Sequence, residues 1–191
     1  ILKAIEETTF LISHELILVD DGSTDGSRAF LEHYHAEHPH VRLVLHERNR
    51  GKGAAVRSGI QAASGVWIAV QDADLEYDPA DINQLLEPAL RGLADLVLGS
   101  RFMPGRFRRA MYFWHAMANH ILTTAANMLA DLNLTDMGTG LKLARASLLK
   151  TVDLRNERCD IEPELVIKLS RCRARIYETP VTYRGRTYAE G

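Results

Sequence analysis

The sequence predicts an α/β fold with a mainly parallel sheet flanked by helices. Through the first hundred residues, short apolar runs suited to buried strands alternate with helix-length segments. Two of these runs, residues 15–20 and 66–71, end at aspartates. Ligands of open α/β sheets bind outside the carboxyl ends of the strands, so these two ends predict a binding site. The 191 residues contain no internal repeat or low-complexity linker and suit a single domain.

The expected helices have recognisable starts and ends. Thr24 or Asp25 can cap a helix that ends before Pro39. Pro79 or Ala80 can open another, since proline is tolerated at the first helical position. In the first hundred residues the expected helices are 2–7, 24–35, 53–63 and the one from residue 79, and the expected strands are 15–20, 41–45, 66–71 and 95–99.

The alternation stops after residue 100. Residues 101–109 form a basic loop with proline and glycine, and a long helix is expected over 110–132. That helix is rich in aromatic and Met side chains but interrupted by His and Asn, so it is either a core helix or an interfacial one. A shorter helix over 162–171 and a strand over 176–183 follow, and Pro180 indicates that this strand is an edge or bulged.

Composition excludes several classes of protein. Apolar residues make up 46% and charged residues 25%, as in globular chains. The net charge of −2 gives no support to nucleic-acid binding. No signal peptide or run of 18 apolar residues is visible, and Cys159 and Cys172 lack metal-type spacing, which is typical of reduced thiols in a cytosolic protein. The chain starts without Met inside a helix, so we expect a domain fragment.

Both acidic strand ends have a simple and a functional interpretation. Asp20 and Asp21 could serve only a turn and a helix cap. If the strand continues, Asp72 and Asp74 share one of its faces, and Glu76 is next on that face. Carboxylate oxygens suit Mg²⁺ or Mn²⁺. Two acidic ends in one crevice therefore favour a site for a cation and a phosphorylated ligand, and hence an enzyme.

Basic and glycine-rich segments add candidates. Gly51-Lys52-Gly53 matches no complete phosphate-loop motif, so close packing of the helix on the sheet is expected, with Lys52 or Arg50 near a phosphate as the lesser alternative. Histidines 33, 35, 38 and 40 fit no zinc spacing and are expected at a solvated helix end. The arginines of the basic loop, Arg101, Arg106, Arg108 and Arg109, are either solvated or a phosphate clamp.

Six segments along almost the whole chain together resemble family 2 glycosyltransferases of the GT-A fold, a Rossmann-like architecture. They resemble most the polyprenyl-phosphate branch, of the dolichyl-phosphate mannosyltransferase type. The segments are VDDGSTDG (19–26), DADLEYDP (72–79), GSRF (99–102), TDMGTG (135–140), DIEPE (160–164) and RGRTY (184–188). The resemblance implies that the family's first strand precedes residue 1. One departure is residues 138–140, where the family has bulkier side chains.

The resemblance implies a role for each matching residue. Asp20 and Asp21 would contact the nucleotide, and Asp72 and Asp74 would bind the nucleotide and its metal, Mg²⁺ or Mn²⁺. The nucleotide-sugar candidates are Asp20, Asp21, Lys52, Asp72 and Arg184; the acceptor-phosphate candidates are Arg101, Arg106 and Arg108; the metal candidates are Asp74 and Glu76; and the catalytic candidates are Asp74, Arg101 and Arg186.

The implied reaction is inverting transfer of a hexose from a nucleotide sugar, of the GDP-mannose or UDP-glucose type, to a polyprenyl or dolichyl phosphate. A membrane-surface partner and a peripheral location on the cytoplasmic face are implied as well. A phosphate acceptor needs no general base, because its second pKa of about 6 leaves it largely dianionic at neutral pH. Transfer to a saccharide hydroxyl, in polysaccharide or cell-envelope synthesis, is the alternative. It would need a base such as Asp136, Asp160 or Glu162. A non-catalytic nucleotide-sugar-binding module and a nucleotidyltransferase also stay open.

Overall fold

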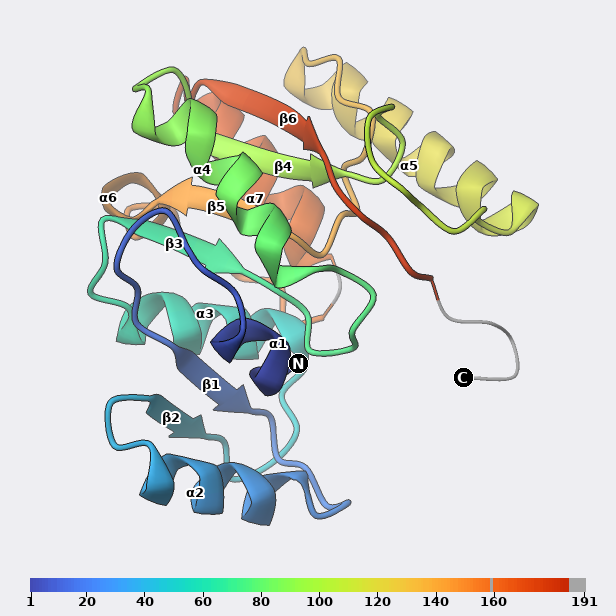
Figure 1. The fold of residues 1–191 in the computed structure, drawn as a ribbon. Coiled ribbons are helices and arrows are strands. Elements are labelled where there is room, and N and C mark those ends of the chain that lie inside the picture. Colours follow the sequence, from blue (N-terminus) through green and yellow to red (C-terminus); the bar gives the residue numbers. More distant parts are fainter. Residues whose placement is uncertain (159, 186–191) are drawn as a thin grey trace.

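The computed structural model describes residues 1–158 and 160–185 (Figure 1). Helices and strands alternate along the chain. The helical elements are α1 (Leu2–Glu6), α2 (Ser27–Glu37), α3 (Lys52–Ala62), the 3₁₀ turn η1 (Pro79–Asp81), α4 (Ile82–Leu90), α5 (Phe113–Ala130), α6 (Ala146–Leu149) and α7 (Ile161–Arg171). The strands are β1 (Ile17–Asp20), β2 (Arg42–Leu45), β3 (Trp67–Val70), β4 (Leu96–Ser100), β5 (Lys142–Arg145) and β6 (Ile176–Pro180).

Within the described residues, the strands form a two-stranded and a four-stranded sheet. β1 and β2 are parallel. The larger sheet has the order β3-β5-β4-β6, in which β4 and β6 are parallel and β5 runs antiparallel to both of its neighbours. The predicted α/β class, with parallel strands flanked by helices, is confirmed. Because β5 runs against the other strands, the larger sheet is mixed.

The sequence pattern does not predict β5. Its four residues, Lys142–Arg145, begin and end with a cation and follow a glycine-rich segment. β5 nevertheless pairs with β3 on one side and β4 on the other. Pairing on both edges outweighs the weak local preference, because strand formation depends strongly on the neighbouring strands.

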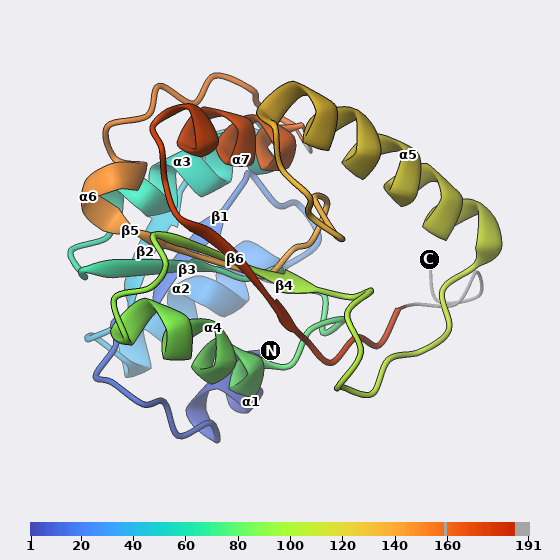
Figure 2. The same ribbon diagram turned by 90° about the horizontal axis from the view of Figure 1, so that it is seen from above.

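Helices cover both faces of the larger sheet (Figures 1 and 2). α4 lies on one face, and α3 and α7 lie on the other. Successive residues of β4 point to opposite faces, so Leu96 and Leu98 join the apolar cluster with α3 and α7, while Val97 joins the cluster with α4. Every residue of β4 is buried, which makes this strand the centre of the core.

Several element ends differ from the predicted ones. α2 begins at Ser27 instead of residue 24 or 25, because Gly22 and Gly26 adopt positive φ angles of 75° and 93° and the chain is still turning there. β6 ends at Pro180 instead of residue 183. It pairs with β4 on one side only, so the predicted edge position is confirmed.

α5 is shorter than predicted, ending before Asp131, which has a φ angle of 51°. Among the described residues, no helix has the length and apolar character needed to cross a membrane. His33 and His40 are exposed near the end of α2. Cys172 is an exposed free thiol, and Cys159 lies outside the described residues.

Candidate active site at the acidic strand ends

The first acidic strand end holds its own turn together. Asp20 is 3% exposed, and its carboxylate accepts hydrogen bonds from the Ser23 amide at 3.3 Å and from Nε of Arg28 at 2.9 Å. Burial alone would raise the pKa of Asp20, but the hydrogen bonds from Ser23 and Arg28 outweigh it and lower that pKa. This carboxylate ties β1 to α2. Its predicted contact with a nucleotide remains a prediction.

Asp21 binds the segment that leads into α3. Its carboxylate accepts from the amides of Arg50 at 2.9 Å and Gly51 at 2.7 Å, and it lies 2.6 Å from Nδ1 of His46. The other ring nitrogen of His46 is 2.8 Å from the Ser58 hydroxyl on α3. Burial would raise the pKa of Asp21, yet these hydrogen bonds lower it. Asp21 therefore places the residues just before Lys52.

The glycines around Lys52 are needed for a close approach of backbone to backbone. A Cβ on Gly51 would lie 2.3 Å from the Glu157 carbonyl oxygen, and one on Gly53 would lie 2.2 Å from that of Asn156. The Gly53 amide donates to the Glu157 carbonyl at 2.8 Å. These two glycines face the segment before α7, while α3 itself packs on the sheet as predicted, where a Cβ on Gly59 would meet Val19 of β1 at 3.5 Å.

Lys52 connects the two acidic strand ends. Its Nζ lies 2.7 Å from Oδ2 of Asp72 and 2.7 Å from Oε1 of Glu162. Burial would lower the pKa of Lys52, but the charges of Glu162 and Asp72 outweigh it and raise that pKa. Because Asp21 binds the amide of residue 51 and Lys52 binds Asp72, the ends of β1 and β3 lie on one side of the molecule, as the sequence predicted.

Asp72 lies against a glycine of the 138–140 segment. A Cβ on Gly140 would come within 2.4 Å of Oδ2 of Asp72. The amide of Gly140 donates to the Tyr77 hydroxyl at 2.9 Å, which fixes the backbone there. A bulkier residue at position 140 would displace the Asp72 carboxylate. This glycine is therefore a requirement of the acidic strand end.

Asp74 and Glu76 lie in the loop after β3. Oδ1 of Asp74 accepts from the Glu76 amide at 3.1 Å, and Oε2 of Glu76 accepts from the Tyr183 hydroxyl at 3.1 Å. Between them, Leu75 has a φ angle of 64° and is 58% exposed. A non-glycine residue in this conformation is uncommon, and such strain is often found at functional sites.

The donor atoms of this loop suit a hard cation. Carboxylate oxygens are the ligands that Mg²⁺ and Mn²⁺ prefer. Over residues 1–158 and 160–185, no three or more His, Cys, Asp or Glu side chains converge as a metal site would require. Mg²⁺ is commonly held by one or two carboxylates together with substrate phosphates. Asp74 and Glu76 therefore fit a divalent cation as a partial set of ligands.

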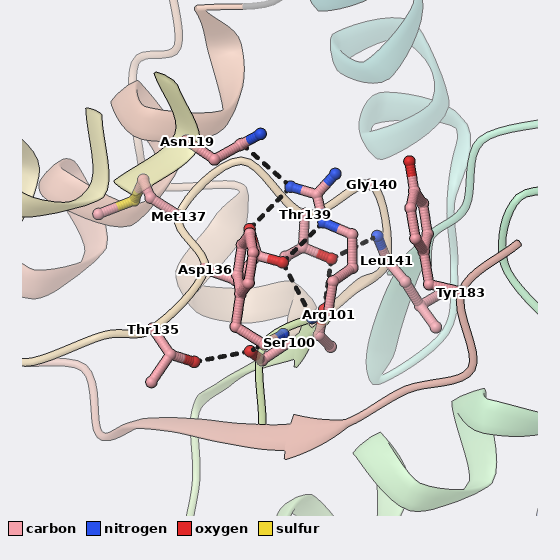
Figure 3. A network of polar contacts seen from close by, with 12 residues as sticks. Ser100, Arg101, Asn119, Thr135, Asp136, Met137, Thr139, Gly140, Leu141 and Tyr183 are labelled. Carbon is pink, nitrogen blue, oxygen red and sulfur yellow. Dashed lines mark hydrogen bonds and ion pairs between the residues drawn. The ribbon is translucent and has the colours of Figure 1, made fainter. Parts of the chain in front are cut away.

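Arg101 forms a buried ion pair with Asp136 (Figure 3). The distances are 2.7 Å from its Nε to Oδ2 and 2.8 Å from its Nη2 to Oδ1, and Nη2 also donates to Asn119 at 3.2 Å. Burial would lower the pKa of Arg101, while Asp136 raises it and prevails. The guanidinium fork that was predicted to meet the acceptor phosphate is thus bound to Asp136 here.

The remaining predicted arginines have other partners. Nε of Arg106 is 3.5 Å from Asp81, and Nη1 of Arg108 donates to the Arg101 carbonyl. Arg184 is exposed, and its amide donates to the Glu76 carbonyl at 2.8 Å. The basic loop and residues 181–185 therefore lie beside the loop that carries Asp74. Arg186 lies outside the described residues.

Three polar residues of this region received no role from the sequence patterns. Lys142 is 4% exposed and belongs to the unpredicted β5. Tyr77 and Tyr183, both buried, pack with ring centroids 5.4 Å apart. A single Tyr or Lys does not by itself indicate a binding site, so these residues could be placed there only from the structure.

Comparison with known proteins gives a consistent family. The family model described as Glycosyl transferase family 2 matches residues 3–153. The dodecaprenyl-phosphate galacturonate synthase of Rhizobium johnstonii is 36% identical over 177 residues, covering 91% of this chain and 50% of the relative. The undecaprenyl-phosphate mannosyltransferase of Micrococcus luteus is 30% identical over 186 residues, covering 92% of this chain and 74% of the relative. The chain thus spans about half the length of the first relative.

A solved structure supports the fold. The chain superimposes on glucosyl-3-phosphoglycerate synthase of Mycobacterium tuberculosis, crystallised with UDP, with a TM-score of 0.72. The two sequences are 22% identical, and the match covers 97% of this chain and 65% of that one. A further structure of the same synthase, with a TM-score of 0.71, contains Mn²⁺ and UDP-glucose. At this level of identity the likeness establishes the fold alone.

Proposed function

The chain belongs to glycosyl transferase family 2, and from that premise we propose that it transfers a hexose from a nucleotide sugar to a polyprenyl or dolichyl phosphate. Two relatives whose names specify dodecaprenyl and undecaprenyl phosphate support this acceptor. The donor would be of the GDP-mannose or UDP-glucose type, and the configuration at the anomeric carbon would be inverted. The observation that carries the proposal is the outer face of α5.

α5 presents an uncharged apolar face to solvent. None of its 18 residues is Asp, Glu, Lys or Arg, and only Thr123 and Ala126 are buried. Phe107, in the basic loop before it, is 90% exposed. Within α5 itself, the exposed large apolar residues are Phe113, Trp114, Met117, Ile121, Leu122, Met128 and Leu129.

This combination fits an interfacial helix. An apolar face preceded by arginines binds the boundary of a membrane that contains anionic lipids, with Trp at the level of the headgroups. α5 follows the loop of Arg101 and lies at one side of the larger sheet (Figure 2). A lipid phosphate in the membrane surface would then meet the arginine-rich edge of the site. We infer a peripheral location on the cytoplasmic face.

The acidic strand ends would hold the donor. Asp72, Lys52 and Arg184 are the proposed contacts to the nucleotide sugar, and Asp74 with Glu76 would hold Mg²⁺ or Mn²⁺. Bound there, such a cation would neutralise charge on the leaving nucleoside diphosphate. An oxygen of the lipid phosphate attacks the anomeric carbon, and the bond from that carbon to the diphosphate breaks with its electron pair on the diphosphate. Arg101, Arg106 and Arg108 are proposed to orient the acceptor, and Arg186 is proposed to act in catalysis from the terminal loop that closes on the sugar donor.

Two candidate bases for the alternative acceptor are already engaged. Asp136 is bound to Arg101, and Glu162 lies 2.7 Å from Nζ of Lys52. Each of these carboxylates already has a cationic partner. A phosphate acceptor needs no base, so these ion pairs favour it over a saccharide hydroxyl.

The test is a transfer assay with the full-length protein. UDP-glucose, GDP-mannose and UDP-N-acetylglucosamine are each offered with Mn²⁺ and a short polyprenyl phosphate, and NMR identifies the anomer formed. We expect one donor to give a lipid-linked sugar of inverted configuration. Transfer to free saccharides instead, or donor binding without transfer to any acceptor, would contradict the proposal.

Membrane binding is tested separately by flotation with vesicles. The pair Phe113→Ser and Trp114→Ser should reduce binding to vesicles that contain phosphatidylglycerol, since it removes apolar area from the outer face of α5. Phe30, which is 59% exposed on α2, supplies the matched control Phe30→Ser. Equal losses in the two proteins would contradict docking through α5.

A further inference from the structure

Lys142 is a buried cation that the proposed transfer does not use. It is 4% exposed, its Nζ donates to the Thr139 carbonyl, and the same atom lies 3.5 Å from Oε1 of Glu162. Burial lowers the pKa of Lys142, and the charge of Glu162 opposes that shift. Lysine is almost never fully buried unless it is paired. The position of Lys142 beside Glu162 therefore requires an explanation.

Two ammonium groups share one oxygen of Glu162. Nζ of Lys52, on α3, lies 2.7 Å from Oε1, and Nζ of Lys142, on β5, lies 3.5 Å from the same atom. The side chain of Lys52 is 30% exposed and that of Lys142 is 5% exposed. The space that these three side chains border measures about 10 Å³, which is at the lower limit for one water molecule. Only the outer lysine can therefore turn toward a ligand.

If Lys52 turned away, both Asp72 and Glu162 would lose its positive charge. Asp72 is 26% exposed at its side chain and can be solvated or bind a ligand, whereas Glu162 is only 13% exposed. Removing the only cationic partner of a largely buried carboxylate strongly destabilises the folded protein. A second cation that stays in place removes most of this cost.

We propose that Lys142 is a positioning residue that keeps Glu162 paired when Lys52 turns to the diphosphate of a nucleotide sugar. This rests on the proposed function, in which Lys52 contacts that diphosphate. The register supports the arrangement, because Lys142 on β5 pairs with Val70, the last residue of β3, two positions before Asp72. Lys142 thus lies on the strand next to the end of β3, where the donor would bind.

The proposal is tested by donor affinity in a set of variants of the full-length protein. Calorimetry with Mn²⁺ first compares UDP-glucose with GDP-mannose, and the tighter donor is used throughout. Lys142→Met keeps the length of the side chain and removes its charge, and we expect donor binding about tenfold weaker. In a Lys52→Met background the same change should have no effect, because no lysine has to be released.

A rescue variant separates positioning from packing. Glu162→Gln should restore donor affinity to Lys142→Met, because a neutral amide tolerates the loss of a cation better than a carboxylate does. Lys150→Met is the matched control. Its Nζ donates to the Ala63 carbonyl at 2.6 Å, away from the acidic strand ends, and its removal should leave the affinity unchanged.

The outcomes are distinct. An equal loss of affinity from Lys142→Met with and without Lys52 would show a role in packing only and would overturn the proposal. If Lys142→Met does not fold by circular dichroism, its combination with Glu162→Gln is compared with Glu162→Gln alone, and different affinities would overturn the proposal. If neither lysine affects donor binding while transfer to polyprenyl phosphate persists, the inference fails and the proposed function stands.

Discussion

The end of β1 and the end of β3 each carry two aspartates, but their surroundings differ. Asp20 and Asp21 accept hydrogen bonds from several groups of the protein, including the amides of Ser23, Arg50 and Gly51. Asp72 and Asp74 are both partly exposed. The Asp72 carboxylate instead faces a side-chain cation, since Nζ of Lys52 lies 2.7 Å from its Oδ2.

The difference separates a structural role from a binding role. Amide donors belong to the backbone and cannot leave without unfolding the turn that they form. A lysine side chain can turn away and admit another cation or a phosphate. We therefore expect the β1 end to determine where the loop of Lys52 lies, and the β3 end to bind the ligand.

The largest expected effect is on catalysis at the β3 end. Asp74→Asn should lower transfer by about 10³-fold, because the leaving diphosphate loses its proposed cation site. Removal of divalent cations with a chelator should do the same to the unmodified protein. Thermal unfolding should not change. Asp25→Asn, at an exposed aspartate after β1, is the control, and near-normal turnover in Asp74→Asn would remove the metal role.

The next effect is on stability at the β1 end. Asp20→Ala should lower the free energy of unfolding by about 2 kcal/mol, because the Ser23 amide and Arg28 lose a charged acceptor. Urea unfolding measures this change. Turnover per folded molecule should fall much less than in Asp74→Asn. If Asp20→Ala is as stable as the unmodified protein but binds the donor more weakly, then Asp20 contacts the nucleotide. The β1 end would in that case bind ligand as well, and the two strand ends would not differ in role.

A smaller effect should follow from crowding Asp72. Gly140→Ala places a Cβ within 2.4 Å of Oδ2 of Asp72, so the carboxylate has to move. We expect donor affinity to fall about tenfold, as measured by calorimetry. Gly59→Ala is the matched control, because its Cβ would meet only Val19 at 3.5 Å, an ordinary contact. Equal affinities in the two variants would contradict the assignment of Asp72 to the donor.

The smallest effect is on the pH dependence of stability. The pKa of Asp21 is lower in the folded protein than its ordinary value of 3.8. Its ionised form therefore stabilises the fold above pH 3.8, and this contribution is lost as the pH falls through the folded pKa. Asp21→Asn should be less stable than the unmodified protein at pH 6, by about 1 kcal/mol. The two unfolding curves should converge in strong acid, and a constant gap would refute the link.

Much of the fold followed from local sequence patterns. The strands at 17–20, 42–45, 67–70 and 96–100 are apolar or alternating runs, and the ends of each lie within two residues of the prediction. β5 was not predicted, and it shows why local patterns are insufficient. A strand of two cations and two apolar residues forms because β3 and β4 pair with it, and no local pattern contains that information.

The candidate site divides in the same way. Sequence alone determined which residues have the chemistry to bind a cation or a nucleotide. Strand-like runs followed by carboxylates indicated Asp20, Asp21, Asp72 and Asp74. The tertiary structure alone decided how those groups are used. It paired Lys52 with Glu162, 110 positions away, and Arg101 with Asp136, 35 positions away. Turns and helix caps join residues that are close in sequence and leave a pattern there, whereas the partner of a buried charge is determined by packing, which brings distant segments within 3 Å.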